Sequence, residues 1–355
     1  MIAIDGAAGE GGGQILRTAL TLSLVTGQPF RIDRIRAGRP RPGLAPQHLQ
    51  AVRAAAAVGE ARVEGARKGS TSLAFTPGRV RSGTFRFDIG TAGAASLVLQ
   101  TVALPLAWVG APSRVAITGG THVPWSPCFE YLDLQWRPFL EGMGVEVQLA
   151  LERAGFYPRG GGRLQALLGP ARLPLRPLDL AEPGRLLGIG GVSAVGRLPR
   201  SIAERQRRRA LDRLARWRVP VEVEVAEVPA PSPGTYLVLV GRFERSRACV
   251  SALGARGKPA ERVADEAVEE LEEVLGSGAP VDAHAGDQLL LPLALARGSS
   301  VMRVPRVTGH LVTNAWVIRQ FVPQSRVEIE GEEGRPGRVR VEGAALGGPG
   351  LPGSR

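Results

Sequence analysis

A glycine-rich stretch near the start of the chain is the first feature that could carry chemistry. It covers residues 5–14 with the sequence DGAAGEGGGQ and precedes an apolar segment typical of a helix. Free backbone N–H groups at the start of a helix attract anions. The stretch lacks the Gly-Lys-Ser/Thr ending of a P-loop and the G-x-G-x-x-G spacing of a dinucleotide site. Two interpretations remain open, a phosphate-binding loop or a tight structural turn.

Several arginines follow this stretch closely. Arg17 lies one helical turn into the apolar segment, and Arg36, Arg39 and Arg41 belong to a segment that also contains two prolines. A stiff loop that holds several arginines suits phosphate binding, because less side-chain entropy is lost when the ligand binds. The alternative is a solvated basic loop without a ligand.

The chain has four histidines, His48, His122, His284 and His310. His310 begins the segment HLVTN at a predicted helix start. A helix N-terminus disfavours the imidazolium, so the ring there would be neutral and nucleophilic. The alternative is an ordinary surface or capping residue. No Cys/His pair has zinc-site spacing, so the sequence predicts no structural zinc.

Composition indicates a globular protein with a polyanionic partner. Of 355 residues, 44% are hydrophobic and 22% are charged, which excludes a disordered chain. Lys+Arg number 45 against 33 Asp+Glu, and Lys68 and Lys258 are the only lysines. Arginine binds phosphate with two nitrogens at once. A GC-rich genome, which replaces lysine by arginine throughout, is the alternative explanation and accounts for most of the arginine count. The net charge of +12 itself still favours a polyanionic partner.

Cysteine usage and hydropathy bear on the compartment. Two cysteines, Cys128 and Cys249, cannot form a disulfide framework, which favours a reducing cytoplasm. No basic-then-apolar leader opens the sequence, so we expect no signal peptide. The uncharged stretch between Asp88 and Arg114 contains prolines and small residues and predicts a buried helix rather than a membrane span.

Three stretches of the chain repeat one pattern of predicted elements. The first has helices at 14–26 and 46–58 and strands at 30–36, 72–76 and 84–89. The second has helices at 94–108 and 129–140 and strands at 114–118, 145–151 and 163–168. The third has helices at 288–296 and 310–321 and strands at 301–304, 326–330 and 338–342.

An additional segment separates the second and third stretches. It contains predicted strands near 187 and at 219–225 and 236–240, a basic helix at 201–217 and an acidic helix at 260–275. The predicted fold is therefore α+β: three repeated βα units, each with two helices and a four-stranded sheet, around a common core, plus a small inserted α/β domain. Residues 1–184 and 278–343 form the discontinuous main domain, 185–277 the insertion, and 344–355 a disordered tail.

Ten short blocks resemble the RNA 3′-terminal phosphate cyclase family, in the family's order. They are EGGGQILR at 10–17, IRAGR at 35–39, PGL at 42–44, QHL at 47–49, LQT at 99–101, GGT at 119–121, YPRGGG at 157–162, GKP at 257–259, GDQLLLP at 286–292 and HLVTN at 310–314. The match extends from about Ile2 to Glu342. The family fold, three repeated βα units and a small inserted domain, agrees with the predicted elements.

The resemblance implies an ATP-dependent enzyme that converts an RNA 3′-phosphate end into a 2′,3′-cyclic phosphate. The histidine that matches His310 takes AMP from ATP and releases pyrophosphate. The RNA 3′-phosphate then accepts the AMP, and the neighbouring 2′-OH displaces it. The implied partners are ATP, a divalent metal (Mg²⁺ or Mn²⁺) and RNA with a 3′-phosphate end, with no membrane.

The resemblance also implies site residues. Glu10 matches the metal-binding acid. The phosphate-binding set corresponds to Arg17, Arg36, Arg39 and Gln47. The nucleotide pocket corresponds to Gln100, Pro127, His284, Ala285, Gly286, Asp287 and Gln288. No role follows for His48 or Arg41.

Two other functions compete. Relatives that act in ribosome assembly have a similar sequence but lack the nucleophilic histidine, so His310 disfavours that interpretation. Enolpyruvyl transferases share the repeated βα architecture, but their chemistry needs no histidine–nucleotide bond. A plain RNA-binding module is disfavoured by the aromatic content of 5% and by the lack of a visible stacking motif.

Overall fold

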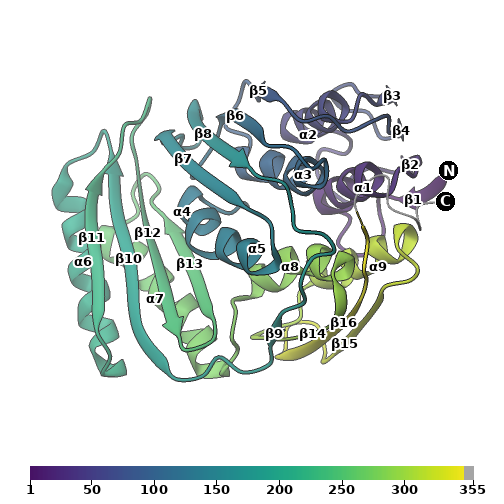
Figure 1. Cartoon of the computed structure of the whole chain (residues 1–355). Helices are drawn as coiled ribbons and strands as arrows, with labels where there is room; N and C mark the ends of the chain where they lie inside the picture. The colour runs from purple at the N-terminus through teal and green to yellow at the C-terminus, as the bar shows by residue number, and fades with distance from the viewer. Residues whose placement is uncertain (348–355) are drawn as a thin grey trace.

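The computed structural model describes residues 1–347 as a mixed α/β protein with four four-stranded sheets (Figure 1). Each sheet combines one parallel strand pair with two antiparallel pairs. Parallel neighbours need a crossover connection, and helices supply it here.

The first sheet has the strand order β1-β2-β4-β3. Its strands are β1 (Ile2–Asp5), β2 (Phe30–Asp33), β3 (Arg62–Glu64) and β4 (Leu73–Thr76). Helix α1 (Gly13–Thr26) connects β1 to β2, and α2 (Pro46–Val58) follows β2. Gly27 ends α1 in the left-handed region at φ 72°, where glycine carries no steric cost, and proline opens α2.

The second sheet repeats this order as β5-β6-β8-β7. Its strands are β5 (Thr84–Asp88), β6 (Ser113–Gly119), β7 (Val147–Arg153) and β8 (Gly162–Leu168). Helix α3 (Ala95–Trp108) connects β5 to β6. The next helix consists of α4 (Phe129–Tyr131), a π-helical turn η1 (Leu132–Trp136) and α5 (Arg137–Met143).

The third sheet, β9-β14-β16-β15, is assembled from two distant parts of the chain. Strand β9 (Asp179–Leu180) precedes the fourth sheet in sequence, whereas β14 (Arg297–Val304), β15 (Arg326–Glu330) and β16 (Gly337–Ala344) follow it. Helices α8 (Ala283–Leu295) and α9 (Gly309–Phe321) flank β14 in the chain. Apart from the long excursion after β9, its elements follow one another as in the first two sheets.

The fourth sheet has a different order, β11-β10-β12-β13. Its strands are β10 (Leu186–Gly196), β11 (Val221–Glu227), β12 (Gly234–Phe243) and β13 (Arg247–Leu253). Helix α6 (Arg200–Leu214), followed by the 3₁₀ turn η2 (Ala215–Trp217), and helix α7 (Ala260–Ser277) pack against it. Figure 1 shows this sheet and its helices on one side of the molecule, next to β7 and α4.

Buried apolar side chains tie the first three sheets together. Leu20 of α1, Leu99 of α3 and Leu290 of α8 belong to one continuous cluster of fully buried residues. Burial of each such side chain stabilises the fold by about 1.5–3 kcal/mol. Helix α1 contacts α2, α3 and α9, so the helix starts that follow the strands are held close together.

Strand β12 is buried on both faces. Leu237 and Leu239 point into a cluster with α6 and α7. Tyr236 and Val238, on the opposite face, pack with Phe156 and other residues that follow the strands of the second sheet. The two-residue period of a strand explains this division. The fourth sheet therefore has a core with its own helices and a second one shared with the second sheet.

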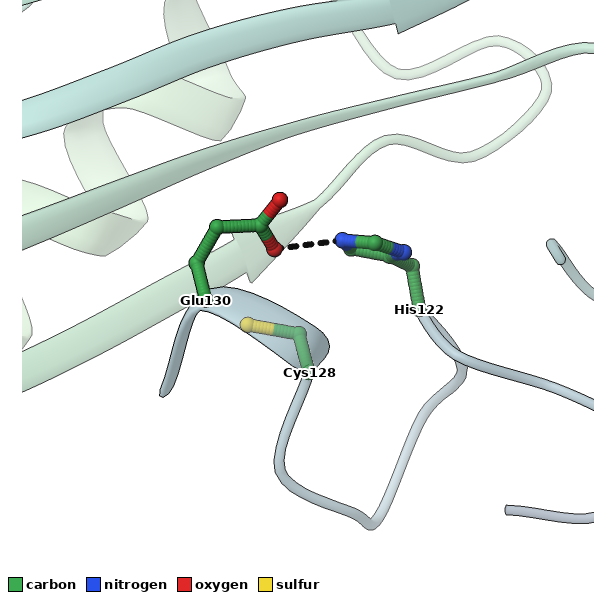
Figure 2. Close-up of side chains that lie close together, drawn as sticks. All are labelled: His122, Cys128 and Glu130. Atoms are coloured by element: carbon green, nitrogen blue, oxygen red, sulfur yellow. Dashed lines mark hydrogen bonds and ion pairs between the residues drawn. The ribbon is translucent and has the colours of Figure 1, made fainter. Parts of the chain in front are cut away.

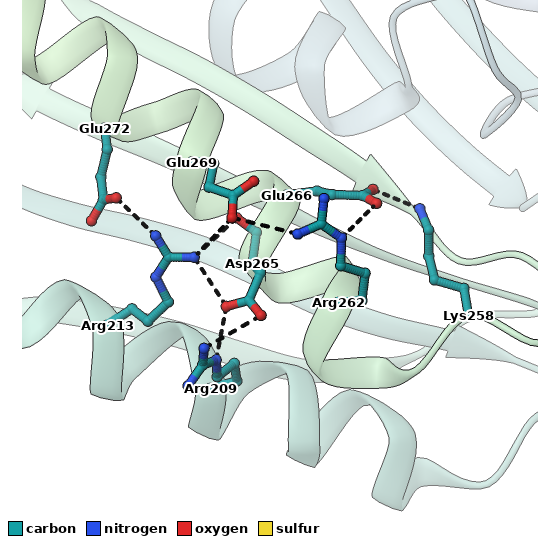
Figure 3. Close-up of polar contacts among 8 residues, drawn as sticks. All are labelled: Arg209, Arg213, Lys258, Arg262, Asp265, Glu266, Glu269 and Glu272. Carbon is teal, nitrogen blue, oxygen red and sulfur yellow. Dashed lines mark hydrogen bonds and ion pairs between the residues drawn. The ribbon is translucent and has the colours of Figure 1, made fainter.

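The basic helix α6 and the acidic helix α7 neutralise each other (Figure 3). Arg213 contacts Asp265 at 3.0 Å, Glu269 at 3.3 Å and Glu272 at 3.0 Å. Arg209 also binds Asp265, at 2.8 Å. Charged side chains therefore join α6 to α7 at the surface, whereas both helices pack apolar side chains against the sheet beneath them.

We predict that Arg213→Gln lowers the free energy of unfolding by about 1 kcal/mol, with a smaller loss in 1 M salt. The Arg213 side chain is only 23% exposed and serves three acids, so more is lost than for an isolated surface pair. Urea unfolding at two salt concentrations measures both effects. Arg62→Gln, which breaks an exposed pair with Glu64, is the control with no expected change. Equal stabilities of the Arg213 and Arg62 variants would contradict the prediction.

Several sequence predictions need correction. The strand predicted at 84–89 belongs to the second sheet as β5, not to the first unit. Strands β1, β3, β9 and β13 were missed; three of these have four residues or fewer, and β13 is buried on both faces and lacks clear alternation. Helix α8 begins at Ala283 rather than at 288, because Asp282 caps it, so Gly286 lies inside the helix and not in a turn before it.

The predicted disordered tail is wrong for residues 344–347. Ala344 ends β16, the N–H groups of Ala345 and Leu346 donate to Ala296 and Leu295, and the Trp108 indole donates to the carbonyl of Gly347. Residues 348–355 lie outside the described part of the chain. Among residues 1–347 no helix is long and apolar enough to cross a membrane.

Candidate active site

The glycine-rich stretch forms the turn between β1 and α1 and lies against the start of α9. Gly9 has a φ of +54°, and a Cβ there would approach the Thr313 Oγ1 to 2.4 Å. The backbone N–H of Glu10 donates to the same Oγ1 at 3.2 Å. Position 9 therefore requires glycine, both for its positive φ and for the close approach of Thr313. The turn and the first residues of α1 and α9 meet here, where helix N–H groups favour anions.

His310 and Glu10 meet at this junction. Nδ1 of His310 contacts Oε2 of Glu10, and Nη2 of Arg39 contacts Oε1 of the same carboxylate. The His310 side chain is 42% exposed, so it is neither buried nor distant from the turn. Nδ1 faces the acid, and no residue within 1–347 hydrogen-bonds Nε2. Nε2 is therefore the ring nitrogen left for a ligand.

The pKa of His310 is shifted in the direction opposite to the one expected at a helix N-terminus. The helix N-terminus alone would favour a neutral ring, but the Glu10 carboxylate raises the pKa of His310, against the opposing effect of partial burial. The contact with His310 in turn lowers the pKa of Glu10, although desolvation acts in the other direction. The sequence analysis considered only the helix N-terminus, because the partner acid is contributed by a segment about three hundred residues away.

We predict that Glu10→Gln lowers the pKa of the His310 ring, because the imidazolium loses its anionic partner. The neutral, nucleophilic ring then appears at lower pH. An NMR titration of the imidazole resonances in the free protein measures this shift directly. Glu333→Gln is the matched control, since that carboxylate lies beside Gly309 but does not contact the ring. An unchanged His310 pKa in Glu10→Gln would contradict the assigned pair.

Arg17 lies buried near this pair, and Arg36 belongs to the loop that carries Arg39. Burial lowers the pKa of Arg17 to about 10, partly offset by Glu10, and its Nη2 donates to Gln14 at 2.7 Å. Arg36, at φ +54°, donates from Nη1 to the carbonyls of Arg41 at 2.8 Å and Gly43 at 2.9 Å. Desolvation and the charge of Arg39 lower the pKa of Arg36. Arg36 thus holds its own loop in shape, which the sequence did not reveal.

Two residues in the first turn of α2, Gln47 and His48, are also held by hydrogen bonds. His48 is 4% exposed, and its Nδ1 accepts from the Ala45 N–H at 3.2 Å. Burial lowers the pKa of His48 to about 3, assisted by the nearby arginines, so this ring is neutral. The Gln47 Oε1 accepts from the N–H of Ala94, the capping residue of α3, at 3.2 Å.

Part of the predicted nucleotide pocket adjoins the same junction. Asp287 is 6% exposed and accepts a hydrogen bond from Thr308, the capping residue of α9. Burial raises the pKa of Asp287 to about 7, with Thr308 and His310 acting in the opposite direction. The next residue of α8, Gln288, accepts from Gln100 Nε2 at 2.6 Å. The structure therefore brings Asp287 close to His310 and pairs Gln288 with Gln100.

The remaining predicted pocket residues are not joined to this network. The His284 side chain is 57% exposed, and its ring lies 3.9 Å from Glu270 of α7. Ala285 and Gly286 are buried in the first turn of α8, and a Cβ at Gly286 would approach Val304 to 2.7 Å. Pro127 is half-buried in the loop before α4 and has no polar side-chain atom. His284, Ala285 and Gly286 lie at the start of α8, and Pro127 lies in the loop before α4.

Asp282, which the sequence analysis missed, connects these pieces. It is 1% exposed, and its Oδ1 accepts from Tyr131 at 2.7 Å and from the Ala285 N–H at 2.9 Å. Its Oδ2 accepts from Gln135 at 2.8 Å and from the Cys249 N–H at 3.3 Å. One carboxylate therefore fixes α8 to the π-helical turn and to β13.

Other residues at the junction were also missed. Thr313 and Asn314 follow His310 at spacings of three and four, which place all three on one face of α9. Asn314 Nδ2 donates to the Asp287 carbonyl at 3.0 Å, and Thr18 donates to Asn314 Oδ1 at 2.6 Å. Helical spacing from His310 was the signal that could have identified them.

Glu10 is chemically suited to a hard divalent cation. Its Oε2 is buried without a well-formed hydrogen bond, although it faces His310. Mg²⁺ is commonly held by one or two carboxylates together with water and substrate phosphates. A single protein carboxylate therefore fits, provided that the contacts with Arg39 and His310 open.

The fold and the site together define a mixed α/β protein in which a histidine, an acid and several arginines meet where helices begin. This is the arrangement of a phosphate-binding site with a nucleophile. The family model described as RNA 3'-terminal phosphate cyclase matches residues 8–327. The chain belongs to the RNA 3′-terminal phosphate cyclase family.

Three relatives that carry the name RNA 3'-terminal phosphate cyclase illustrate the similarity. The chain is 44% identical to that of Methanopyrus kandleri, over 96% of this chain and 98% of the relative. It is 44% identical to that of Methylococcus capsulatus, over 98% of both chains. It is 49% identical to that of Ralstonia nicotianae, over 91% and 92%.

A solved structure of the enolpyruvyl transferase NikO from Streptomyces tendae is a much more distant match. It is 17% identical, with a TM-score of 0.24, and covers 47% of this chain and 33% of that one. A similarity at this level carries no argument about fold or function.

Proposed function

We propose that the protein uses ATP to convert the 3′-phosphate end of RNA into a 2′,3′-cyclic phosphate. The carrying observation is the position of His310: partly exposed, in contact with Glu10 of the glycine turn, and next to Arg39. The family membership supports the same reaction. A non-catalytic ribosome-assembly role leaves this constellation without a purpose.

The reaction has three steps. His310 Nε2 attacks the α-phosphorus of ATP, a P–N bond forms and pyrophosphate leaves. An oxygen of the RNA 3′-phosphate then attacks the same phosphorus, and the histidine departs. Finally the adjacent 2′-OH attacks the RNA phosphorus, loses its proton and expels AMP. Covalent transfer divides a difficult displacement into easier ones, and the last step is intramolecular.

The residues around His310 orient it and bind charge. In the free protein Glu10 fixes Nδ1 and directs Nε2 outward. Once its contacts with His310 and Arg39 open, the Glu10 carboxylate would hold the divalent metal, which would neutralise charge on the phosphates. Arg17, Arg39 and the amide of Gln47 bind phosphate oxygens, and Arg36 keeps their loop in shape. Because the Glu10 contact raises the pKa of His310, attack requires loss of that proton and is favoured as pH rises.

We assign the nucleotide pocket to the side of α8. Asp287 lies next to His310, and its neighbour Gln288 pairs with Gln100. His284, Ala285, Gly286 and Pro127 extend the pocket towards the loop before α4. The contact of Tyr131 with Asp282 supports this extension, because it holds α4 against the start of α8.

We also propose an evolutionary and domain organisation. The shared strand order of three sheets supports three repeats of one βα unit, formed by residues 1–184 and 278–343. The different order of the fourth sheet supports an inserted domain at 185–277. Two cysteines that form no disulfide support a cytoplasmic location.

The test uses an oligoribonucleotide with a 3′-phosphate, ATP and a divalent metal. We expect a product that resists phosphatase and regains sensitivity after mild acid opens the cyclic phosphate. A matched oligonucleotide with a 2′-deoxy terminal sugar is the control: it should accumulate as an adenylylated end without cyclising, because the attacking hydroxyl is missing. The adenylylated end also resists phosphatase, so mass spectrometry separates the two products: the deoxy product keeps AMP, whereas the cyclic product does not. A ribo substrate that gains no resistance, or a deoxy substrate that gains resistance without AMP, would refute the proposal.

A further inference from the structure

A second cluster of reactive side chains lies outside the candidate active site (Figure 2). His122 follows β6, and Cys128 and Glu130 lie at the start of α4. One imidazole nitrogen, the thiol sulfur and one carboxylate oxygen all lie within 4.8 Å of one another. Figure 2 shows His122 on the loop before α4 and Cys128 and Glu130 at the start of that helix, with the dashed line joining His122 to Glu130.

We propose that His122, Cys128 and Glu130 form a zinc site. Nitrogen, sulfur and carboxylate oxygen are the donors that Zn²⁺ takes, at about 2.0–2.3 Å from the metal. Tetrahedral coordination would change the distances between the three ligand atoms by about 1 Å or less. Small rotations of the side chains can produce that change. The fourth ligand would be a water molecule next to the Tyr236 hydroxyl, whose oxygen lies 2.5 Å from the other oxygen of Glu130.

The neighbours of His122 fix its ring in one orientation. The His122 side chain is fully buried, and its ring stacks on Tyr236 with centroids 4.1 Å apart. The other ring nitrogen, Nδ1, lies 2.9 Å from Thr121 Oγ1. Metal-binding histidines typically have such a partner, which fixes the ring orientation. Nε2 points at Glu130 at 2.6 Å, towards the proposed ion.

Protons balance when the ion enters. The Cys128 thiol releases its proton to solvent. In the metal-free protein a neutral His122 carries its proton on Nε2, and on zinc binding this proton moves to Nδ1. The Nδ1–H group then donates a hydrogen bond to Thr121 Oγ1, which already accepts one from the N–H of Gly155 at 2.9 Å. The His122–Glu130 hydrogen bond is thereby exchanged for two bonds to the metal. One proton leaves per zinc, with no redox change.

The position indicates a structural role. The cluster belongs to the core shared between the fourth sheet and the elements of the second sheet, and Tyr236 contributes to it from β12. Zinc there would close the 122–130 loop and fix it beside β12. The sequence predicted no structural zinc, because the spacing of His, Cys and Glu across nine residues matches no zinc-finger pattern.

Cobalt provides the sharpest test, in the full-length, tag-free protein after treatment with a chelator. We expect one Co²⁺ per chain, a thiolate-to-cobalt charge-transfer band in the near ultraviolet, and loss of that band on addition of one equivalent of Zn²⁺. Cys128→Ala should lose the band, whereas Cys249→Ala, at the other thiol of the same core, should keep it. Glu10→Gln should also keep it, which separates this site from the active-site metal.

A second measurement does not depend on the variants. Zn²⁺ should raise the thermal midpoint of the stripped wild-type protein and of Cys249→Ala, but not of Cys128→Ala. The inference is overturned if the wild type shows no thiolate band, or if Cys128→Ala shows the same band as the wild type. Circular dichroism of each variant confirms that it is folded before metal is added.

Discussion

His310→Ala is expected to abolish transfer of label from α-labelled ATP to the protein, with a loss of at least about 10³-fold in cyclisation. The variant removes the ring nitrogen that is proposed to form the P–N bond, and the other side chain that contacts Glu10, Arg39, is a guanidinium and no nucleophile. The wild-type label should be acid-labile, as a phosphoramidate is. Denaturing gels after brief incubation with labelled ATP give the measurement.

Arg319→Ala is the control for this experiment. Arg319 is exposed in the last turn of α9, at the other end of the same helix, so the variant should label like the wild type. Label that persists in His310→Ala would place the nucleophile elsewhere. An unlabelled wild-type protein, given ATP and Mg²⁺ or Mn²⁺, would overturn the covalent mechanism while leaving the family membership intact.

Asp282→Ala is expected to lower the free energy of unfolding by about 3–4 kcal/mol. The carboxylate is 1% exposed and accepts four hydrogen bonds, so its removal leaves buried donors on Tyr131, Gln135 and two backbone N–H groups without partners. Urea unfolding followed by circular dichroism measures the loss.

Two further variants make that prediction specific. Asp282→Asn keeps the shape and one acceptor oxygen, so we expect an intermediate loss of about 1–2 kcal/mol. Asp212→Ala changes an exposed carboxylate on α6 and should alter stability by less than about 0.5 kcal/mol. If Asp282→Ala and Asp212→Ala unfold at the same urea concentration, the hydrogen bonds to Asp282 contribute nothing to the fold.

The sequence predicted most of the long elements, for identifiable physical reasons. Helix α2 was expected at 46–58 and is found at those residues, because Pro46 opens it and the apolar run ends at Gly59. The short strands β3 and β9 were missed, since two or three residues carry no periodicity. The assignment of β5 failed for another reason: pattern shows that a strand exists but not which sheet it joins.

The site was predicted less completely than the fold. Glu10, Arg39 and His310 were named through the family resemblance, and the structure brings them into contact. The direction of the pKa shift of His310 could not be predicted, because it depends on an acid that is distant in sequence. Asp282 was not found at all: one buried aspartate in a sequence gives no sign of how many donors surround it.

The division of the third sheet has a consequence for how the protein is made. Strand β9 leaves the ribosome long before β14, the strand that it pairs with, and the N–H of Glu10 waits for a hydroxyl acceptor 303 positions later in the chain. Contacts of such long range form late in folding. A nascent chain that ends before α9 lacks both His310 and the Thr313 acceptor, so the proposed reaction can begin only when synthesis is almost finished.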